Sequence, residues 1–582
     1  MQAIPHTSKA VLTAGAVYLL VLIAAYIRIF FGLNFTDEAY YVALSSTFAE
    51  GRRPFIDELF FQQTGALVTV PLVKAYLGAF GHDGLVLFMR HGFYALSCSV
   101  SFLTVAILSR TLPLAPSLLT GAFLMTFVPA NISNLSYNTQ AYLGLLSGSL
   151  LVGRACASKR GLLIYSAGLA LLALASFSFV PVTAGALVAV AASLVAHHRQ
   201  KSPWGRPLSV ITLLAGLGAI GALAILVVDP QRREALYTDI IFHFSIGVYA
   251  GGIAKLDKVA RSVVPLLPFL AAASAGLVTL LSVRRLKPVV RFTAATALFS
   301  LAYLLARHSI NGSPTSVPWA HFWGLAPLLA LATPRRFSDD FNALVHSVWL
   351  PALVAGMVLS WAASGYFAAA VIGLLPGVIV GLMMPFGLRE RAEPGNTFRV
   401  VALFSLLLLS QIVDLYRYTF RDSPISELGS RIEAGSFAGI RTSNARREFI
   451  EAIERDLREY ELSHSTVLFL DYFPAGYLMT RLRPETPALW TLGPNNVAGG
   501  SLAYRSYYAR YFDTHPLPDV VVQMKAVPAQ DGVDTGIVYF PDRDPLLLRL
   551  FGAGHYTVGT ERERYRIFIG GSAVNATRPE SG

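Results

Sequence analysis

Long apolar runs recur along this chain, and they limit its possible folds more than any other feature. A helix of about 20 apolar residues is needed to cross the hydrocarbon core of a bilayer. The first such run starts at Val11, and similar runs continue through the first two thirds of the chain. We therefore predict about thirteen membrane-spanning helices, near residues 10–32, 85–109, 113–130, 138–153, 161–178, 180–196, 207–228, 262–283, 290–307, 317–333, 343–362, 365–385 and 397–417.

The composition supports this prediction. Of the 582 residues, 54% are hydrophobic and 14% are charged, whereas about 25% are charged in a typical soluble domain. A soluble fold cannot bury so much apolar surface, so the chain is predicted to be a polytopic α-helical membrane protein. A disordered, fibrous or disulfide-stapled chain is excluded. The two cysteines, Cys98 and Cys156, lie far apart in or beside apolar runs and offer neither a disulfide framework nor a cysteine metal site.

The positive charge lies mainly in alternate connections between the predicted spans. The net charge is +12. If the N-terminus is cytoplasmic, the cytoplasmic connections hold seventeen Lys and Arg residues, and the short outer connections near 131–137, 179 and 363 hold none. Because cytoplasmic loops are typically rich in Lys and Arg, this bias places the N-terminus in the cytoplasm and the chain after the last span outside. This orientation also explains most of the net positive charge, so no nucleic-acid partner is predicted.

Two domains are predicted. Residues 1–419 form the membrane domain, and residues 420–582 form a soluble α/β domain in the periplasm or its equivalent. The second domain has a helical pattern at 443–460. Strand-like runs follow at 466–471, 519–523, 535–540 and 565–569.

The first long outer loop, residues 33–84, carries the most informative polar residues. Thr36 is a suitable N-cap, and Asp37 and Glu38 would occupy the first turn of the following helix. The amides at a helix start favour an ionised carboxylate there. A helix cap alone would explain such a pair. This helix and a second one ending near Lys74 have the apolar and polar sides of interfacial helices.

An ionised carboxylate at the membrane–water boundary suits group transfer from a phosphate leaving group. The carboxylate takes a proton from the acceptor hydroxyl, and nearby cations neutralise the departing phosphate. Arg53 follows the first helix of the loop, and Arg90, Arg307 and His321 lie near the outer ends of predicted spans. These residue types in these positions indicate a transferase site at the outer surface.

The same residues carry a resemblance to the GT-C class of membrane glycosyltransferases. The stretch Asp37-Glu38-Ala39-Tyr40-Tyr41 through Ala49-Glu50-Gly51 is similar to the acid pair, aromatic residue and glycine of the protein mannosyltransferase and lipid A aminoarabinose transferase branch. The segment 319–327 is similar to a His-aromatic segment that opens a late span in these enzymes. The resemblance implies a polytopic bundle, two juxtamembrane helices in the first outer loop and an outer C-terminal domain.

The resemblance also implies a reaction. A hexosyl or pentosyl group would move with inversion from a polyprenyl-phosphate donor to a glycan, lipid or protein acceptor, such as lipopolysaccharide, on the outer face of the cell inner membrane. Asp37 would be the general base, and Glu38 would orient Asp37 or the acceptor. The predicted contacts to the donor phosphate or the substrates are Arg53, Lys74, Arg90, Arg307, His321, Tyr40 and Asn138.

The sequence does not predict a metal site. Relatives that use a metal place a further acid in the outer loop after the third span, and residues 131–138 contain none. Asp83 and Asp239 are the nearby substitutes, and a hard cation needs several oxygen ligands. A divalent metal therefore stays an alternative, and no other cofactor is predicted.

Three other functions stay open. A transporter or lipid-linked sugar flippase usually has ionisable groups at the bilayer midplane, whereas every acid of the membrane part can be placed near a surface. An O-antigen ligase or polymerase would need a large outer loop rich in Arg and His in the latter half, where this chain has a short one. A non-catalytic envelope assembly protein would use the acid pair only as a helix cap.

Overall fold

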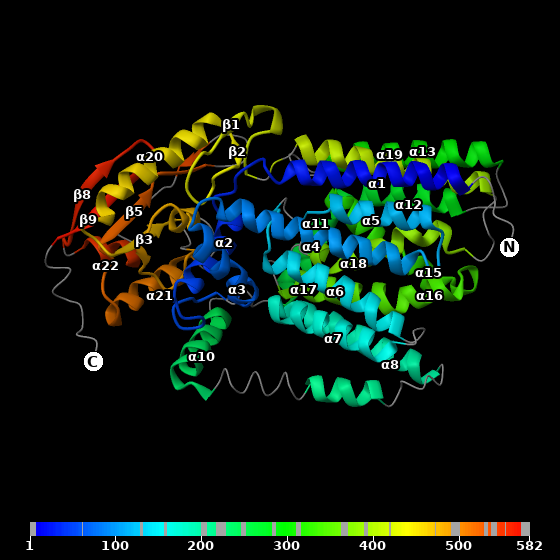
Figure 1. Ribbon diagram of the computed structural model, residues 1–582, viewed down its shortest axis with the longest axis horizontal. Coiled ribbons are helices and arrows are strands. Elements are labelled where there is room, and N and C mark those ends of the chain that lie inside the picture. Colours follow the sequence, from blue (N-terminus) through cyan, green and yellow to red (C-terminus); the bar gives the residue numbers. More distant parts are fainter. Residues whose placement is uncertain are drawn as a thin grey trace.

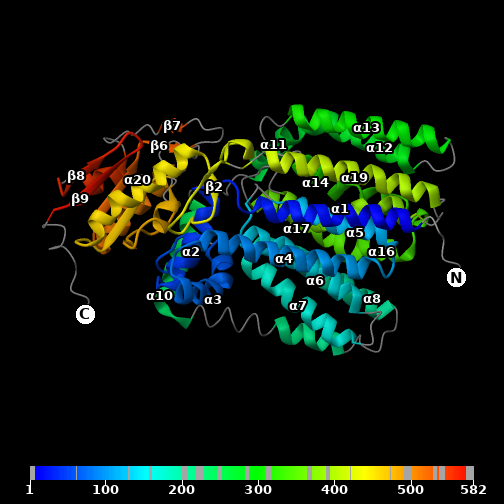
Figure 2. The same ribbon diagram turned by 45° about the horizontal axis from the view of Figure 1, so that its top comes forward.

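The structure divides into a helical bundle and a region of strands at one end of it. The computed structural model describes residues 7–60, 62–128, 132–155, 160–199, 207–216, 228–245, 252–281, 287–309, 316–362, 370–388, 394–417, 419, 421–471, 473–490, 501–528, 534–536, 544–552 and 554–571. Most helices run side by side in Figure 1, and the strands lie beyond one end of them. Figure 2 shows the same division after a turn of 45°.

Each predicted span coincides with a helix in the described part of the chain. Eight of the described helices are long and apolar enough to cross a membrane, and four shorter ones are also apolar. Of the span predicted at 207–228, residues 217–227 lie outside the described residues, and 207–216 are helical. The other spans correspond to α1 (Thr7–Arg28), α4 (Leu85–Leu108), α5 (Leu114–Thr126), α6 (Tyr137–Arg154), α7 (Gly161–Ser178), α8 (Thr183–Arg199), α12 (Leu267–Leu281), α13 (Pro288–Ser309), α14 (Ser316–Leu325), α15 (Leu328–Ala332), α16 (Asp339–Leu344), α17 (Leu350–Ala362), α18 (Ala370–Met383) and α19 (Pro394–Arg417).

Two predicted spans are interrupted. The span predicted at 317–333 consists of α14 and α15, which are separated at Pro327 because proline has no N–H for the helical hydrogen bond. The span predicted at 343–362 contains a π-helical turn at Val345–Trp349 between α16 and α17. The predicted class, a polytopic helical membrane protein with a C-terminal sheet region, is confirmed.

Glycines let helices of the bundle approach backbone to backbone. A Cβ atom added at Gly381 of α18 would lie 1.9 Å from the carbonyl oxygen of Trp323 in α14. A Cβ atom added at Gly373 would lie 2.3 Å from the backbone nitrogen of Gly356 in α17. Small residues at such crossings commonly allow helices to associate in membranes, because burial of apolar surface contributes little to helix association in lipid.

The first outer loop contains the two predicted helices, α2 (Asp37–Ala49) and α3 (Gln63–Phe80). Both views place α2 and α3 between the bundle and the strands (Figures 1 and 2). Residues 38–48 of α2 are all buried, so the prediction that a polar side of this helix faces water is wrong. The short helix Pro474–Leu478 of the C-terminal region packs against α2.

The C-terminal region forms a small α/β unit. Its five-stranded sheet has the order β4-β3-β5-β9-β8, in which β3 pairs in parallel with β4 and β5, and β9 pairs antiparallel with β5 and β8. The predicted helix at 443–460 and three of the predicted strands are present, and most of the fourth, at 535–540, lies outside the described residues. The elements are α20 (Asn444–Glu461), β3 (Thr466–Leu470), β4 (Arg483–Pro484), α21 (Ser501–Thr514), β5 (Val520–Met524), α22 (Pro545–Phe551), β8 (Tyr556–Glu561) and β9 (Tyr565–Gly570).

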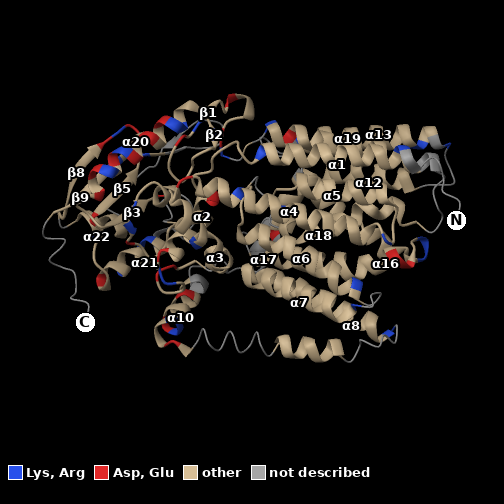
Figure 3. Ribbon diagram, viewed as in Figure 1, with Lys and Arg blue, Asp and Glu red and all other residues tan. Residues whose placement is uncertain are grey.

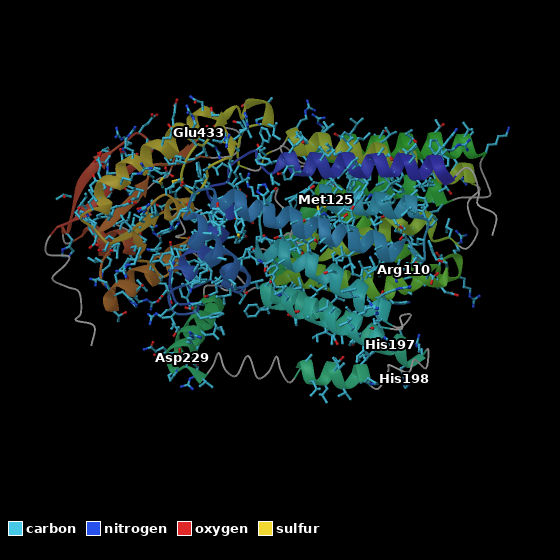
Figure 4. The ribbon with its side chains drawn as sticks, viewed as in Figure 1. Arg110, Met125, His197, His198, Asp229 and Glu433 are labelled. Carbon is cyan, nitrogen blue, oxygen red and sulfur yellow. The ribbon has the colours of Figure 1, made fainter. Side chains whose placement is uncertain are left out.

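Charged residues are distributed unevenly along the bundle. Figure 3 shows few charged residues in the middle of the helices and mostly Lys and Arg at the end far from the strands. Figure 4 places Arg110 and His198 at that far end, and Asp229 and Glu433 at the strand end. The orientation in which this basic end faces the cytoplasm stays a prediction.

Candidate active site

Asp37 begins α2 and forms an ion pair with a residue that follows the last helix of the bundle. Its Oδ2 lies 3.1 Å from Nη1 of Arg421, and the same nitrogen contacts Oγ1 of Thr36. The Asp37 side chain is 19% exposed and that of Arg421 is 32% exposed, so water can reach both partners. The pair therefore joins a carboxylate and a cation that are separated by most of the chain.

The surroundings of Asp37 favour its protonated form more than water does. Burial raises the pKa of Asp37, while Arg421, the backbone amide of Asp37 itself, and the side chains of Thr36 and Asn34 partly oppose that rise. Thr36 occupies the N-cap position, as predicted, but its side chain forms no capping hydrogen bond. Its hydroxyl instead donates to Oδ1 of Asn34 over 2.8 Å. A carboxylate in this setting can accept a proton and release it again.

Glu38, the second acid of the pair, lies in a buried ion pair with Arg90 of α4. Nε of Arg90 donates to Oε1 over 2.7 Å, and Nη2 donates to Oε2 over 2.6 Å. The remaining N–H groups of Arg90 donate to the carbonyl oxygens of Ile29, Phe31 and Gly32. A guanidinium has five N–H groups, and in Arg90 all of them donate to protein acceptors. The predicted contact between Arg90 and the phosphate of the sugar donor does not fit this placement.

Asparagine side chains beside the first turn of α2 have polar groups that a ligand could use. Asn134 donates from Nδ2 to the carbonyl oxygen of Glu38 over 3.0 Å. Asn138 lies next to Tyr137, whose ring packs edge-on against Tyr41 of α2 with centroids 5.1 Å apart. Among the described residues, Nδ2 of Asn34 and Oδ1 of Asn134 and Asn138 are buried without a well-aligned hydrogen-bond partner. A sugar hydroxyl, which both donates and accepts, could pair with such groups.

Tyr40 contacts a second buried acid rather than Asp37. Its hydroxyl donates to Oε1 of Glu58 over 3.4 Å, and its ring packs against Trp490 with centroids 5.1 Å apart. Glu58 also accepts from the backbone nitrogens of Leu489 and Phe60 and lies 3.7 Å from Arg52. These contacts attach the first outer loop to the C-terminal region.

The C-terminal region packs closely on the segment that leads into α2. Phe35 contacts the rings of Phe437, Phe449 and Phe473, with centroid distances of 5.5–6.4 Å. Asp422 accepts from the backbone nitrogen of Leu33 over 2.7 Å and from the hydroxyl of Thr442 over 2.7 Å. Two residues just before Asp37 are therefore held by contacts with a part of the chain almost 400 positions away.

The other predicted contacts belong to four further segments of the chain. Arg53 forms a surface ion pair with Asp57 at 3.1 Å, and Lys74 lies on an exposed part of α3. Arg307 is exposed near the end of α13. His321 is buried in α14, where Nδ1 lies 2.9 Å from the carbonyl oxygen of Val317.

The second outer loop also contacts the C-terminal region. Its helix α10 (Pro230–Ser245) carries Asp239, which accepts a hydrogen bond from the hydroxyl of Tyr507 over 2.9 Å. Phe242 packs on the ring of Tyr507 with centroids 4.3 Å apart. Burial raises the pKa of Asp239 to about 7, and the neighbouring Glu58 adds to the rise.

An apolar cavity lies within the bundle, between α5, α14, the end of α18 and α19. The empty space in and at the mouth of this cavity amounts to about 410 Å³, and this figure includes space that is open to the outside. Leu119, Phe123, Trp323 and Phe404 are among its lining residues, and Trp319 and Gln411 supply polar atoms. Such a lining suits an apolar chain with a small polar group.

In the part of the chain that the structure describes, no group of three or more His, Cys, Asp or Glu side chains is placed to hold a metal ion. No family model and no curated protein matches the sequence. Among solved structures, the crystal structure of ArnT from Cupriavidus metallidurans in the apo state is similar to 96% of this chain and 98% of that chain, with 13% identity and a TM-score of 0.37.

Proposed function

We propose that this protein is a membrane glycosyltransferase in which Asp37 is the general base. The observation that carries the proposal is the placement of Asp37, a partly exposed carboxylate that begins a buried helix and lies beside a cation. This placement is unlike that of Glu38, whose side chain is 4% exposed and paired on both oxygens. A general base must reach its substrate, and Asp37 meets that requirement.

The proposed reaction is a single inverting displacement. Asp37 takes the proton of an acceptor hydroxyl, the hydroxyl oxygen forms a bond to the anomeric carbon of the sugar, and the bond from that carbon to the phosphate oxygen breaks. The electron pair leaves with the phosphate. Asp37 then releases its proton to water, and the raised pKa of this carboxyl makes it a stronger base than an exposed aspartate.

The donor and acceptor classes rest on the resemblance of the 37–51 segment to GT-C enzymes. We propose a polyprenyl-phosphate sugar as the donor and an envelope glycan, lipid or protein as the acceptor, on the outer face of the inner membrane. Three amide atoms without a hydrogen-bond partner, Nδ2 of Asn34 and Oδ1 of Asn134 and Asn138, are candidates for contacts to sugar hydroxyls. Among the predicted phosphate contacts, Arg53, Lys74 and Arg307 are the ones with exposed side chains.

Glu38 and Arg90 have a positioning role in this proposal. Arg90 joins the end of α1, the start of α2 and α4 through one guanidinium, and Glu38 satisfies two of its donors. The pair sets the direction in which α2 starts, and with it the direction of Asp37. Neither residue needs to touch a substrate.

Reconstitution in proteoliposomes tests the function. The purified protein receives a panel of polyprenyl-phosphate sugars and an envelope extract as acceptor, and released polyprenyl phosphate is measured by mass spectrometry. We expect release that requires both donor and acceptor. Transport of a lipid-linked sugar across the vesicle membrane without any cleavage would instead favour the flippase alternative.

A further inference from the structure

We propose that Arg421 is the cation that receives the phosphate of the donor, and that it exchanges Asp37 for this phosphate when the donor binds. This inference rests on the proposed function, and it assigns a residue that sequence patterns did not indicate. The starting point is the geometry of the free protein, in which the Arg421 guanidinium lies 3.1 Å from the Asp37 carboxylate and also contacts Thr36.

Exposure separates this ion pair from the two buried ion pairs near the start of α2. The side chains of Glu38 and Arg90 are each 4% exposed, and those of Asp422 and Arg446 are 0% and 5% exposed. Arg421 is 32% exposed and Asp37 is 19% exposed. An anion arriving from the membrane surface can therefore reach Arg421, whereas Arg90 and Arg446 are already enclosed by protein groups.

The backbone around Arg421 is held firmly although its side chain is accessible. Arg421 has φ +58°, a left-handed conformation that residues other than glycine and asparagine seldom adopt. The next residue, Asp422, fixes this conformation through its contacts with Leu33, Ser423 and Thr442. A strained backbone that its neighbours hold in place often marks a functional position.

This exchange would couple binding of the polyprenyl-phosphate sugar to the basicity of the Asp37 carboxylate. Arg421 opposes the rise in pKa that burial gives to Asp37. When the guanidinium of Arg421 moves from Asp37 to the donor phosphate, the pKa of Asp37 rises further. Asp37 then holds a proton more tightly at the stage when it must take the proton of the acceptor hydroxyl. Arginine binds phosphate with two parallel hydrogen bonds, so the same residue also stabilises the charge that the leaving phosphate gains.

Binding of a polyprenyl phosphate to the full-length protein in phosphatidylcholine nanodiscs tests the inference without relying on activity. Arg421→Asn removes the cation and suits the left-handed backbone, and it should weaken binding about tenfold. Arg421→Lys should bind with intermediate affinity. Asp37→Asn frees Arg421 from its competing carboxylate, so it should bind severalfold more tightly than the wild type. Arg458→Asn, on an exposed side chain of α20, is the matched control and should bind normally.

The outcomes distinguish this inference from the proposed function. If the wild type binds polyprenyl phosphate and Arg421→Asn binds it equally well while remaining folded by thermal unfolding, Arg421 has no role in phosphate binding. Unchanged or weaker binding by Asp37→Asn would refute the exchange. Phosphatidic acid is the comparison ligand, and an equal dependence on Arg421 would assign the residue to membrane anchoring instead. A wild type that binds no polyprenyl phosphate would overturn the donor class as well.

Discussion

Arg90 encloses the carboxylate of Glu38, with Nε 2.7 Å from Oε1 and Nη2 2.6 Å from Oε2. Both side chains are buried, and the same guanidinium holds the carbonyl oxygens of Ile29 and Gly32 at the end of α1. The pair thus joins three segments at the point where the chain leaves the bundle and enters α2. Its contribution should be structural and should act on Asp37 through the orientation of α2.

Arg90→Met should lower the free energy of unfolding by about 3–5 kcal/mol, because it leaves the Glu38 charge buried without a partner. Urea unfolding in detergent measures the loss. The double variant Glu38→Gln with Arg90→Met removes the uncompensated charge and should recover part of the lost free energy of unfolding. Arg53→Met breaks an ion pair whose arginine is 54% exposed, and it should cost less than about 1 kcal/mol. Equal costs for the two single variants would contradict the structural role.

Phe35→Ala should loosen the contact between the C-terminal region and the segment before α2. It removes a ring that packs on Phe437, Phe449 and Phe473, and such a loss typically costs about 3–5 kcal/mol. Hydrogen exchange should rise in the segment 473–478, whose Ala475 nitrogen donates to the Phe35 carbonyl oxygen. Phe80→Ala, at a ring that is 71% exposed, is the control. Unchanged exchange in Phe35→Ala would mean that the aromatic cluster does not hold this contact.

The docking of α10 should weaken as pH rises. Burial raises the pKa of Asp239 to about 7 from 3.8, so the folded state binds more protons than the unfolded state between these values. The docked state is therefore most stable below about pH 4 and loses stability as pH rises to 7. Hydrogen exchange of residues 230–245, corrected for intrinsic rates, should rise across this range. Asp239→Asn should remove the dependence, and Glu234→Gln on an exposed part of the same helix should retain it. A dependence that survives in Asp239→Asn would assign it to another group.

The membrane helices could be predicted because each depends on local sequence. In the described part of the chain, a helix lies at each position where length and hydropathy predicted a span, including the one that Pro327 divides. The helices α2 and α20 and the strands β3, β5 and β9 were also predicted, since their apolar patterns are local. The strand β8 was missed, because its residues alternate little and four of the six are exposed.

The surroundings of the candidate base could not be predicted, because they depend on contacts between distant segments. The position of Asp37 follows from the sequence, but its partner Arg421 is separated from it by the whole bundle and carries no local motif. Arg90 was predicted to bind phosphate because a charge inside a span is costly. The structure offers a different reason for that charge, since Arg90 satisfies Glu38 and three backbone carbonyls. The burial of α2 could not be predicted either, because residues 474–478, which pack against it, belong to the C-terminal region.

We propose that the Asp37 carboxylate takes the acceptor proton. The most direct measurement is single-turnover release of polyprenyl phosphate from a polyprenyl-phosphate sugar in proteoliposomes, comparing the wild type with Asp37→Asn and with Asp57→Asn as the control. Asp37→Asn should insert and unfold like the wild type but lose at least about 100-fold in rate, as expected when a general base is removed. Asp57→Asn, in the same loop, should keep most of its rate. A wild-type rate in Asp37→Asn would contradict the claim.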